Sequence, residues 1–180
     1  LWFDLINSPE GQVPMGSEIT MSQNPRFIVR AAGSFKQKSG CSNESIDSLS
    51  AKRLDYLCAG ECYNPSNQRE VIEKIEVIKI TPQVYAGEAI SPLIQDPWKS
   101  IPCQGKGECI VEFEDQDFSR DSVYYVRAIQ NPTPAINGSP LSQRDNFELC
   151  KGSFRTDLED DCLSMTNERA WSSPIYIDKP

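Results

Sequence analysis

The chain has 180 residues, of which 38% are apolar, and its 26 Asp and Glu outnumber its 18 Lys and Arg to give a net charge of −8. A chain of this length can bury a hydrophobic core, but its acidic balance provides no basic surface for nucleic acid or an anionic membrane. The sequence contains no histidine, which excludes Ser-His-Asp and Cys-His catalytic arrangements and imidazole-ligated zinc. We therefore expect these residues to hold no complete active site.

Short runs of alternating or β-branched residues, separated by Pro, Gly, Asn and Ser, predict strands along most of the chain. In chain order the predicted strands are 1–6, 26–32, 71–80, 88–90, 109–114, 122–129 and 174–178. Only 47–59 has helical spacing, with Ser48 or Ser50 available as the N-cap.

Strands at this density, without regular alternation of strands and helices, predict a mainly β fold. We expect an antiparallel β-sandwich, immunoglobulin-like, with one short helix and loops stapled by disulfides. Residues 1–180 should form a single domain, in which 1–24 make the junction to a domain upstream.

The predicted first strand is apolar on both faces. Leu1, Phe3 and Leu5 share one face, and the other face carries Trp2 and Ile6. A free strand of this kind would expose apolar surface and an unpaired edge. We expect the strand to pair inside a sheet, and Trp2 and Ile6 to contact an upstream domain or another subunit. The sequence lacks a basic leader and any run of 18 apolar residues that could span a membrane.

Seven cysteines occur, and their spacings match no zinc-binding pattern. Two pairs bracket short polar loops, so we predict the disulfides Cys103–Cys109 and Cys150–Cys162. Such loops are typical of an oxidising compartment, which predicts a secreted or periplasmic protein.

The remaining cysteines surround the predicted helix. Cys41 should pair with Cys62 or, as the alternative, with Cys58. The odd total leaves at least one cysteine unpaired or bonded to another chain.

A carboxylate cluster follows the strand predicted at 109–114. Asp115, Asp117 and Asp121 offer hard oxygen ligands, which makes them a weak calcium candidate beside the alternative of a solvated loop. A second acidic run, 157–161, lies between Cys150 and Cys162. We expect no other metal or cofactor site in this chain.

The aromatic residues allow either core packing or a sugar-binding platform. Trp98 and Trp171 are the candidates for stacking on a sugar. We nevertheless predict that Trp171 is buried, where the last strand meets the sheet containing 122–129.

A series of short motifs extends over nearly the whole chain. It includes 13–16 (VPMG), 26–35 (RFIVRAAGSF), 60–63 (GECY), 74–80 (KIEVIKI), 124–129 (YYVRAI) and 169–175 (RAWSSPI). The series resembles the C-terminal portion of an uncharacterised family of exported proteins similar to polymerase-and-histidinol-phosphatase (PHP) metal-dependent hydrolases. The resemblance implies that the metal ligands and the divalent metal belong to an upstream domain, and that no catalytic or cofactor-binding residue lies in this chain.

Three functional hypotheses follow. The leading one is a non-catalytic C-terminal β domain of an exported PHP-like hydrolase, present as a fragment or processed chain. The alternative is a stand-alone secreted module for binding or assembly, such as a carbohydrate-binding or filament-forming sandwich. The third is a carboxylate hydrolase acting alone, which needs two carboxyl groups facing each other across a cleft.

Overall fold

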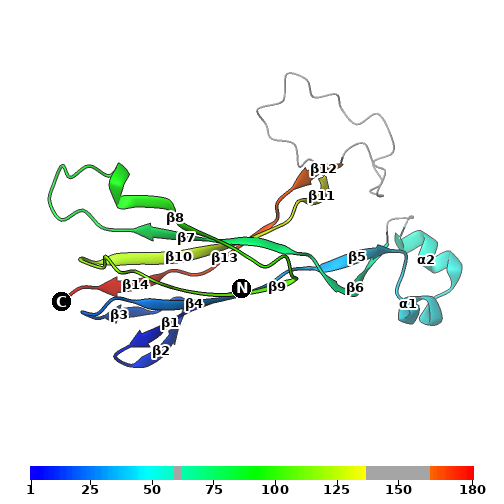
Figure 1. Ribbon diagram of the computed structural model, residues 1–180. Coiled ribbons are helices and arrows are strands. Elements are labelled where there is room, and N and C mark those ends of the chain that lie inside the picture. Colours follow the sequence, from blue (N-terminus) through cyan, green and yellow to red (C-terminus); the bar gives the residue numbers. More distant parts are fainter. Residues whose placement is uncertain (59–61, 137–162) are drawn as a thin grey trace, which may run out of the picture. The chain divides into compact units, whose positions relative to one another are not determined.

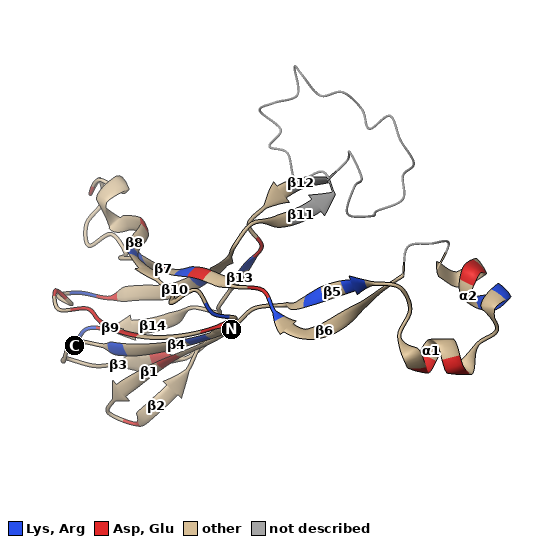
Figure 2. Cartoon of the chain, turned by 45° about the vertical axis from the view of Figure 1, so that its right-hand side comes forward, with Lys and Arg blue, Asp and Glu red and all other residues tan. Residues whose placement is uncertain are grey.

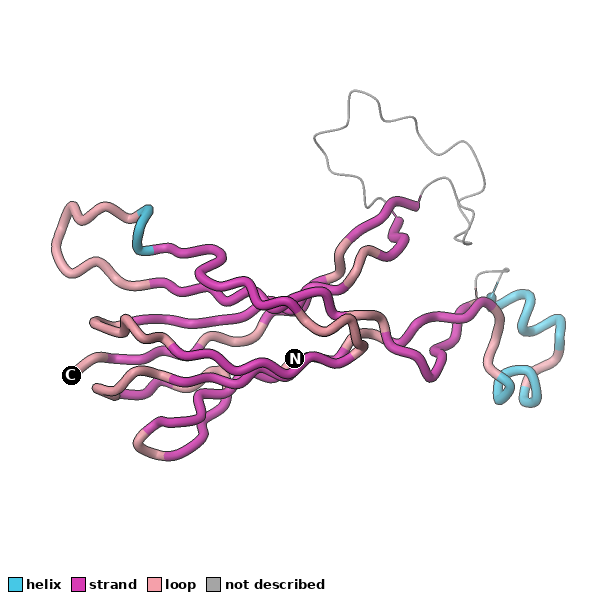
Figure 3. Tube along the Cα trace, viewed as in Figure 1, coloured by secondary structure: helices cyan, strands magenta, loops and turns pink. Residues whose placement is uncertain are grey.

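The computed structural model describes residues 1–58, 62–136 and 163–180 (Figure 1). The chain divides into two compact units, where the sequence predicts one domain. The first unit contains 1–33, 71–131 and 169–180, and the second contains 34–70 and 132–168. The fold is mainly β, as predicted, and strands dominate both units (Figure 3).

The first sheet of the first unit has four antiparallel strands in the order β2-β1-β4-β9. These strands are β1 (Trp2–Ser8), β2 (Gly11–Pro14), β4 (Arg26–Ala32) and β9 (Glu108–Glu114). The alternation seen in the sequence decides which face is buried, because successive side chains of a strand point to opposite faces. Phe3, Leu5, Phe27 and Val29 are accordingly fully buried.

The second sheet is built around two long central strands. Its order is β3-β14-β10-β7-β8, and β13 also pairs with β10. Its strands are β3 (Glu18–Thr20), β7 (Ile72–Ile80), β8 (Ile94–Pro102), β10 (Ser122–Gln130), β13 (Arg169–Trp171) and β14 (Ile175–Asp178), and the 3-10 helix η1 (Ser91–Leu93) precedes β8. Among these pairs, β3 and β14 are parallel and the others are antiparallel.

The strand predicted at 88–90 is absent, and β8 at Ile94–Pro102 takes its place in the sheet. β8 contains Asp96 and Pro97, which are depleted in strands, so its sequence does not predict one. The structure accommodates the proline because β8 lies at the edge of the sheet, where a strand needs fewer N–H donors.

Aromatic rings from the two sheets meet in the core of a β-sandwich. Phe27 lies 5.2 Å from Phe3 and 5.0 Å from Phe113, all on the first sheet, and 4.8 Å from Tyr124 on β10, between ring centroids. Trp98 on β8 meets the edge of this cluster, with its ring centroid 6.2 Å from that of Phe113. These contacts join the two sheets.

The second unit contains two hairpins. β5 (Phe35–Ser39) pairs with β6 (Tyr63–Arg69), and β11 (Thr133–Ile136) pairs with β12 (Leu163–Thr166). Between β5 and β6 lie α1 (Asn43–Ser48) and α2 (Ala51–Cys58).

The single helix predicted at 47–59 is therefore two shorter helices. The Ser42 hydroxyl accepts a hydrogen bond from the Ser45 amide at 3.3 Å and caps α1. Leu49 has extended backbone angles that end α1, and the Ser50 hydroxyl then accepts from the Arg53 amide at 3.3 Å. Neither helix buries a residue. In the described part of the chain, no helix combines the length and apolar character needed to cross a membrane.

We predict that Phe27→Ala destabilises the protein by on the order of 3–5 kcal/mol, because the substitution opens a cavity among three aromatic rings. The control is Ile110→Ala on β9, whose side chain is exposed, and its cost should stay within about 0.5 kcal/mol. Urea unfolding followed by circular dichroism measures both. Equal costs for the two variants would contradict this position of the core.

Candidate functional site

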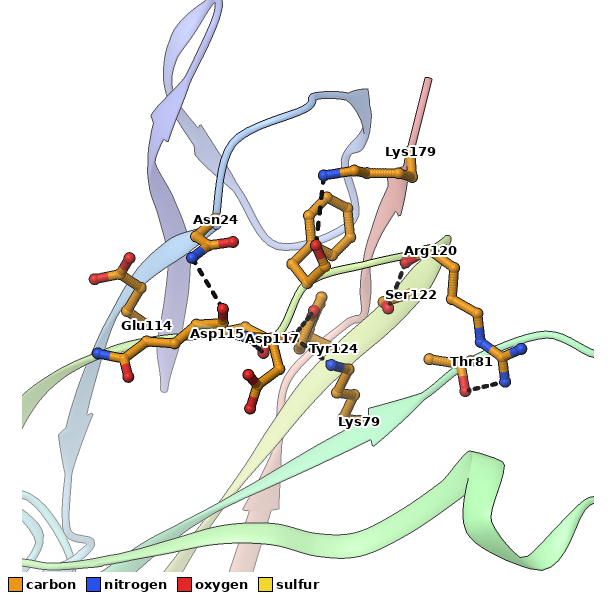
Figure 4. Close-up of polar contacts among 12 residues, drawn as sticks. Asn24, Lys79, Thr81, Glu114, Asp115, Asp117, Arg120, Ser122, Tyr124 and Lys179 are labelled. Atoms are coloured by element: carbon orange, nitrogen blue, oxygen red, sulfur yellow. Dashed lines mark hydrogen bonds and ion pairs between the residues drawn. The ribbon is translucent and has the colours of Figure 1, made fainter.

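The most enclosed charged side chain of the described residues is that of Asp115, which directly follows β9 and is 1% exposed. Its Oδ2 forms an ion pair with Lys79 Nζ on β7 and accepts a hydrogen bond from the Tyr124 hydroxyl on β10 at 2.5 Å (Figure 4). The Asp115 amide also donates to the Pro25 carbonyl, just before β4, at 3.1 Å. One residue therefore links both sheets.

The surroundings keep the Tyr124 phenol protonated. Burial raises the pKa of Tyr124 well above its usual range, and the hydrogen bond and the charge of Asp115 raise the pKa further. Lys79 Nζ also lies 5.3 Å from the Trp98 ring centroid, a favourable contact between a cation and an aromatic face. Since Asp115 and Tyr124 are enclosed, this network is suited to stabilising the sandwich rather than to receiving a substrate.

The calcium candidate does not form as the sequence proposes. Asp115 is paired with Lys79, and its Oδ1 accepts from the Asp117 amide at 3.1 Å. Asp121 instead accepts from the Lys179 amide at 2.8 Å. Within the part of the chain that the structure describes, the carboxylate oxygens of these three residues are not close enough together to bind one ion. The acidic run 157–161 lies outside the described residues.

A second charged network lies on the outer face of β7 and β10. β7 carries acidic and basic residues (Figure 2), and β10 contributes Arg127. The Arg127 guanidinium lies 2.7 Å from Glu76 Oε2 and 2.5 Å from Asp96 Oδ1, and Lys74 Nζ lies 2.9 Å from Glu76 Oε1. Burial by itself would raise the pKa of Glu76, but the hydrogen bonds and charges of Lys74 and Arg127 outweigh it, so the pKa is lowered.

The prediction that Trp171 is buried is wrong, since this residue is 57% exposed. β13 pairs with β10 in a register that places Trp171 opposite Arg127. Directly opposite residues of an antiparallel pair share a face, so Trp171 lies on the outer face with the charged network. On β10, the side chains of Tyr124 and Val126 are buried in the core.

The outer face of the first sheet carries a row of residues that the register places side by side. Arg30 on β4 lies opposite both Trp2 on β1 and Ile110 on β9. Trp2 is 56% exposed and Ile110 is 66% exposed. Arg30 also forms an ion pair with Asp4 at 3.4 Å. We call Trp2, Arg30 and Ile110 the Trp2–Ile110 row. β1 pairs with β2 and β4 inside the sheet, as its sequence predicts.

Cys103 and Cys109 form a disulfide, with 5.7 Å between their Cα atoms. This is the pair that the loop spacing predicts. This bond connects the residue after β8 to the second residue of β9. The predicted pair Cys150–Cys162 lies outside the described residues.

The three cysteines around the helices are arranged differently from the prediction. Cys58 is bonded to Cys62, with 5.1 Å between their Cα atoms, so neither expected bond of Cys41, to Cys62 or to Cys58, is the one that the structure contains. Cys58 is the last residue of α2 and Cys62 directly precedes β6, which makes a bond over four positions geometrically possible. Cys41 is the free cysteine among the described residues.

Cys41 nevertheless lies at this disulfide. Its Sγ is 3.0 Å from Cys58 Sγ, and the three sulfur atoms all lie within 4.8 Å of one another. They line a pocket of about 620 Å³, whose apolar wall includes Leu49, Leu54, Leu57, Tyr63 and Pro65. Sequence spacing does not indicate this cluster, because the proximity of Cys41 and Cys58 depends on the path of α1 and α2.

One comparison with known proteins gives a match. Residues 99–179 are similar to a family described as a protein of unknown function (DUF3604). No curated protein matches the chain, and no solved structure matches it. The matched region contains the end of β8 together with β9, β10 and the C-terminal strands β13 and β14.

We predict that Asp115→Asn costs on the order of 3–5 kcal/mol, because it leaves the Lys79 charge buried without its partner. The double variant Asp115→Asn/Lys79→Met should recover part of this loss, since it removes the second charge as well. The matched control is Asp117→Asn at an exposed position, with a cost below about 0.5 kcal/mol. Urea unfolding measures all three, and a double variant less stable than Asp115→Asn would contradict the assignment.

We predict that Glu76→Gln destabilises the protein at about pH 7 by roughly 1–3 kcal/mol, because two charged hydrogen-bond partners lose their anion. The folded-state pKa of Glu76 lies below its unfolded value. The ionised form therefore stabilises the fold above the unfolded pKa, and this contribution disappears as the pH falls through the folded pKa. The difference from wild type should shrink over that acidic range. A difference that is constant with pH in unfolding experiments would disprove this role.

Proposed function

We propose that this chain is a non-catalytic C-terminal β domain of an exported metal-dependent hydrolase similar to the PHP enzymes. The Trp2–Ile110 row is the observation that carries the proposal, because it offers an apolar surface on a sheet face that the unit's own core does not use. The absence of histidine and the resemblance of the motif series support the same assignment. The disulfide-bonded cysteines support export.

The row has the chemistry of a domain interface. Interface cores favour aromatic residues and arginine, and a tryptophan surrounded by neighbouring contacts contributes strongly once water is excluded. Trp2 and Ile110 flank Arg30, whose charge is already balanced by Asp4. Covering this row would therefore bury two large apolar side chains without leaving an unpaired charge. We propose that the hydrolase domain of the same precursor packs against this row. We also propose that the divalent metal binds in that domain.

The test is to purify the natural protein from its source and to determine its intact mass, N-terminal sequence and metal content. We expect a polypeptide that extends upstream of Leu1 and contains a divalent metal. A mature protein that begins at Leu1, directly after a cleaved signal peptide, would overturn the proposal.

A variant of that natural polypeptide tests the interface itself. Trp2→Ala/Ile110→Ala should leave the sandwich folded, because both side chains are exposed, but should increase proteolysis between the sandwich and the hydrolase domain. The control is Val84→Ser, another exposed apolar residue, which lies outside the row. Proteolysis that is unchanged by the double variant would show that the row is not the interface.

The exposure of Trp171 favours the second candidate, a stand-alone secreted carbohydrate-binding module. A tryptophan on the outer face of a sheet can stack on the apolar face of a sugar. For this candidate, oligosaccharides would change tryptophan fluorescence in wild type but not in Trp171→Ala.

A further inference from the structure

Cys41, Cys58 and Cys62 bring three sulfur atoms together around one disulfide. Cys58 is bonded to Cys62 and is also in contact with Cys41, whose Sγ lies 3.0 Å from Cys58 Sγ. A free thiol in contact with a bonded sulfur is the arrangement from which thiol–disulfide exchange begins. The other described disulfide, Cys103–Cys109, has no third cysteine of this kind within the described residues.

We propose that Cys41, Cys58 and Cys62 form a thiol–disulfide exchange site in which Cys58 is the shared sulfur. Cys41 loses its proton to solvent, and its thiolate attacks Cys58 Sγ. The bond between Cys58 and Cys62 breaks, a bond between Cys41 and Cys58 forms, and Cys62 leaves as a thiolate that takes up a proton. One S–S bond replaces another, so the step needs no oxidant or reductant. The proposal is independent of the assignment of the chain to a hydrolase.

The surroundings allow both arrangements to exist. All three sulfur atoms lie within 4.8 Å of one another, so the exchange needs only short movements of side chains. The three cysteines line the pocket of about 620 Å³, and each is neither fully buried nor fully exposed. The thiol that is free in either arrangement therefore opens toward a space that a small thiol reagent can enter.

A three-thiolate metal site is the competing interpretation of the same cluster. Thiolates bind soft metals, but a metal needs all three cysteines to be reduced. The Cys58–Cys62 bond leaves one thiol in the cluster, so the structure favours exchange.

The experiment maps disulfides in the full chain without prior reduction. The protein is held at about pH 8, quenched with acid, labelled with a maleimide under acidic denaturing conditions, digested and analysed by mass spectrometry. We expect two populations: Cys58–Cys62 with the label on Cys41, and Cys41–Cys58 with the label on Cys62. The Cys103–Cys109 bond should appear in a single connectivity and serves as the internal control.

The rate gives a second, independent measurement. Either population, isolated in acid, should return to the same mixture at about pH 8, and more slowly at about pH 6, because the thiolate rather than the thiol attacks a disulfide. The mixture should persist in Cys150→Ser/Cys162→Ser, which excludes those two cysteines as the source of the exchange. Cys41→Ser should leave only Cys58–Cys62.

Three results would overturn the proposal. The first is a single connectivity with the label on one cysteine at both pH values. The second is isolated forms that do not interconvert at about pH 8. The third is a cluster in which all three cysteines are labelled and in which added Zn²⁺ blocks the labelling of the native protein at about pH 7, which would establish the metal site instead.

Discussion

The fold of the first unit depends on one buried charge. Asp115 follows a strand of the first sheet, and its carboxylate is held by Lys79 and Tyr124 of the second. Since an unpaired charge in this position would be costly, the two sheets can pack only in an arrangement that brings these three residues together. Apolar side chains fill the space between the two sheets. The ion pair between Asp115 and Lys79 limits how far one sheet can slide over the other. Phe27 and Trp98 then pack around a fixed point.

Local pattern predicts much of this sandwich, because burial on one face of a strand leaves a period of two in the sequence. The pattern around Phe27 and Val29 identifies a strand and its inner face. It does not give the register between distant strands, and register decides that Trp171 faces outward beside Arg127. The sequence of β8 does not predict a strand, because an edge strand tolerates residues that weaken the pattern.

The candidate sites differ in the same way: a contact between residues close in the sequence can be predicted, whereas a contact between distant residues depends on the fold. Cys103 and Cys109 are separated by only six positions and lie close together whatever the rest of the chain does, so their spacing predicts the bond. The cluster around Cys58 instead depends on where α1 ends at Leu49 and on how α2 returns toward Cys41. For Asp115, the sequence shows a carboxylate in an acidic loop, but only the fold reveals Lys79 beside it, 36 positions away along the chain.

The parallel pairing of β3 with β14 has a consequence for how the protein is made. β14 lies between β3 and β10, and it brings Ile177 beside Ile19. β3 therefore has no neighbour in this sheet until β14 has been synthesised. A nascent chain can form the hairpin of β1 and β2 early, but this edge of the second sheet closes only once β14 is available. Contacts so distant along the chain slow folding, so the pairing of β3 with β14 should be a late step in the folding of this unit.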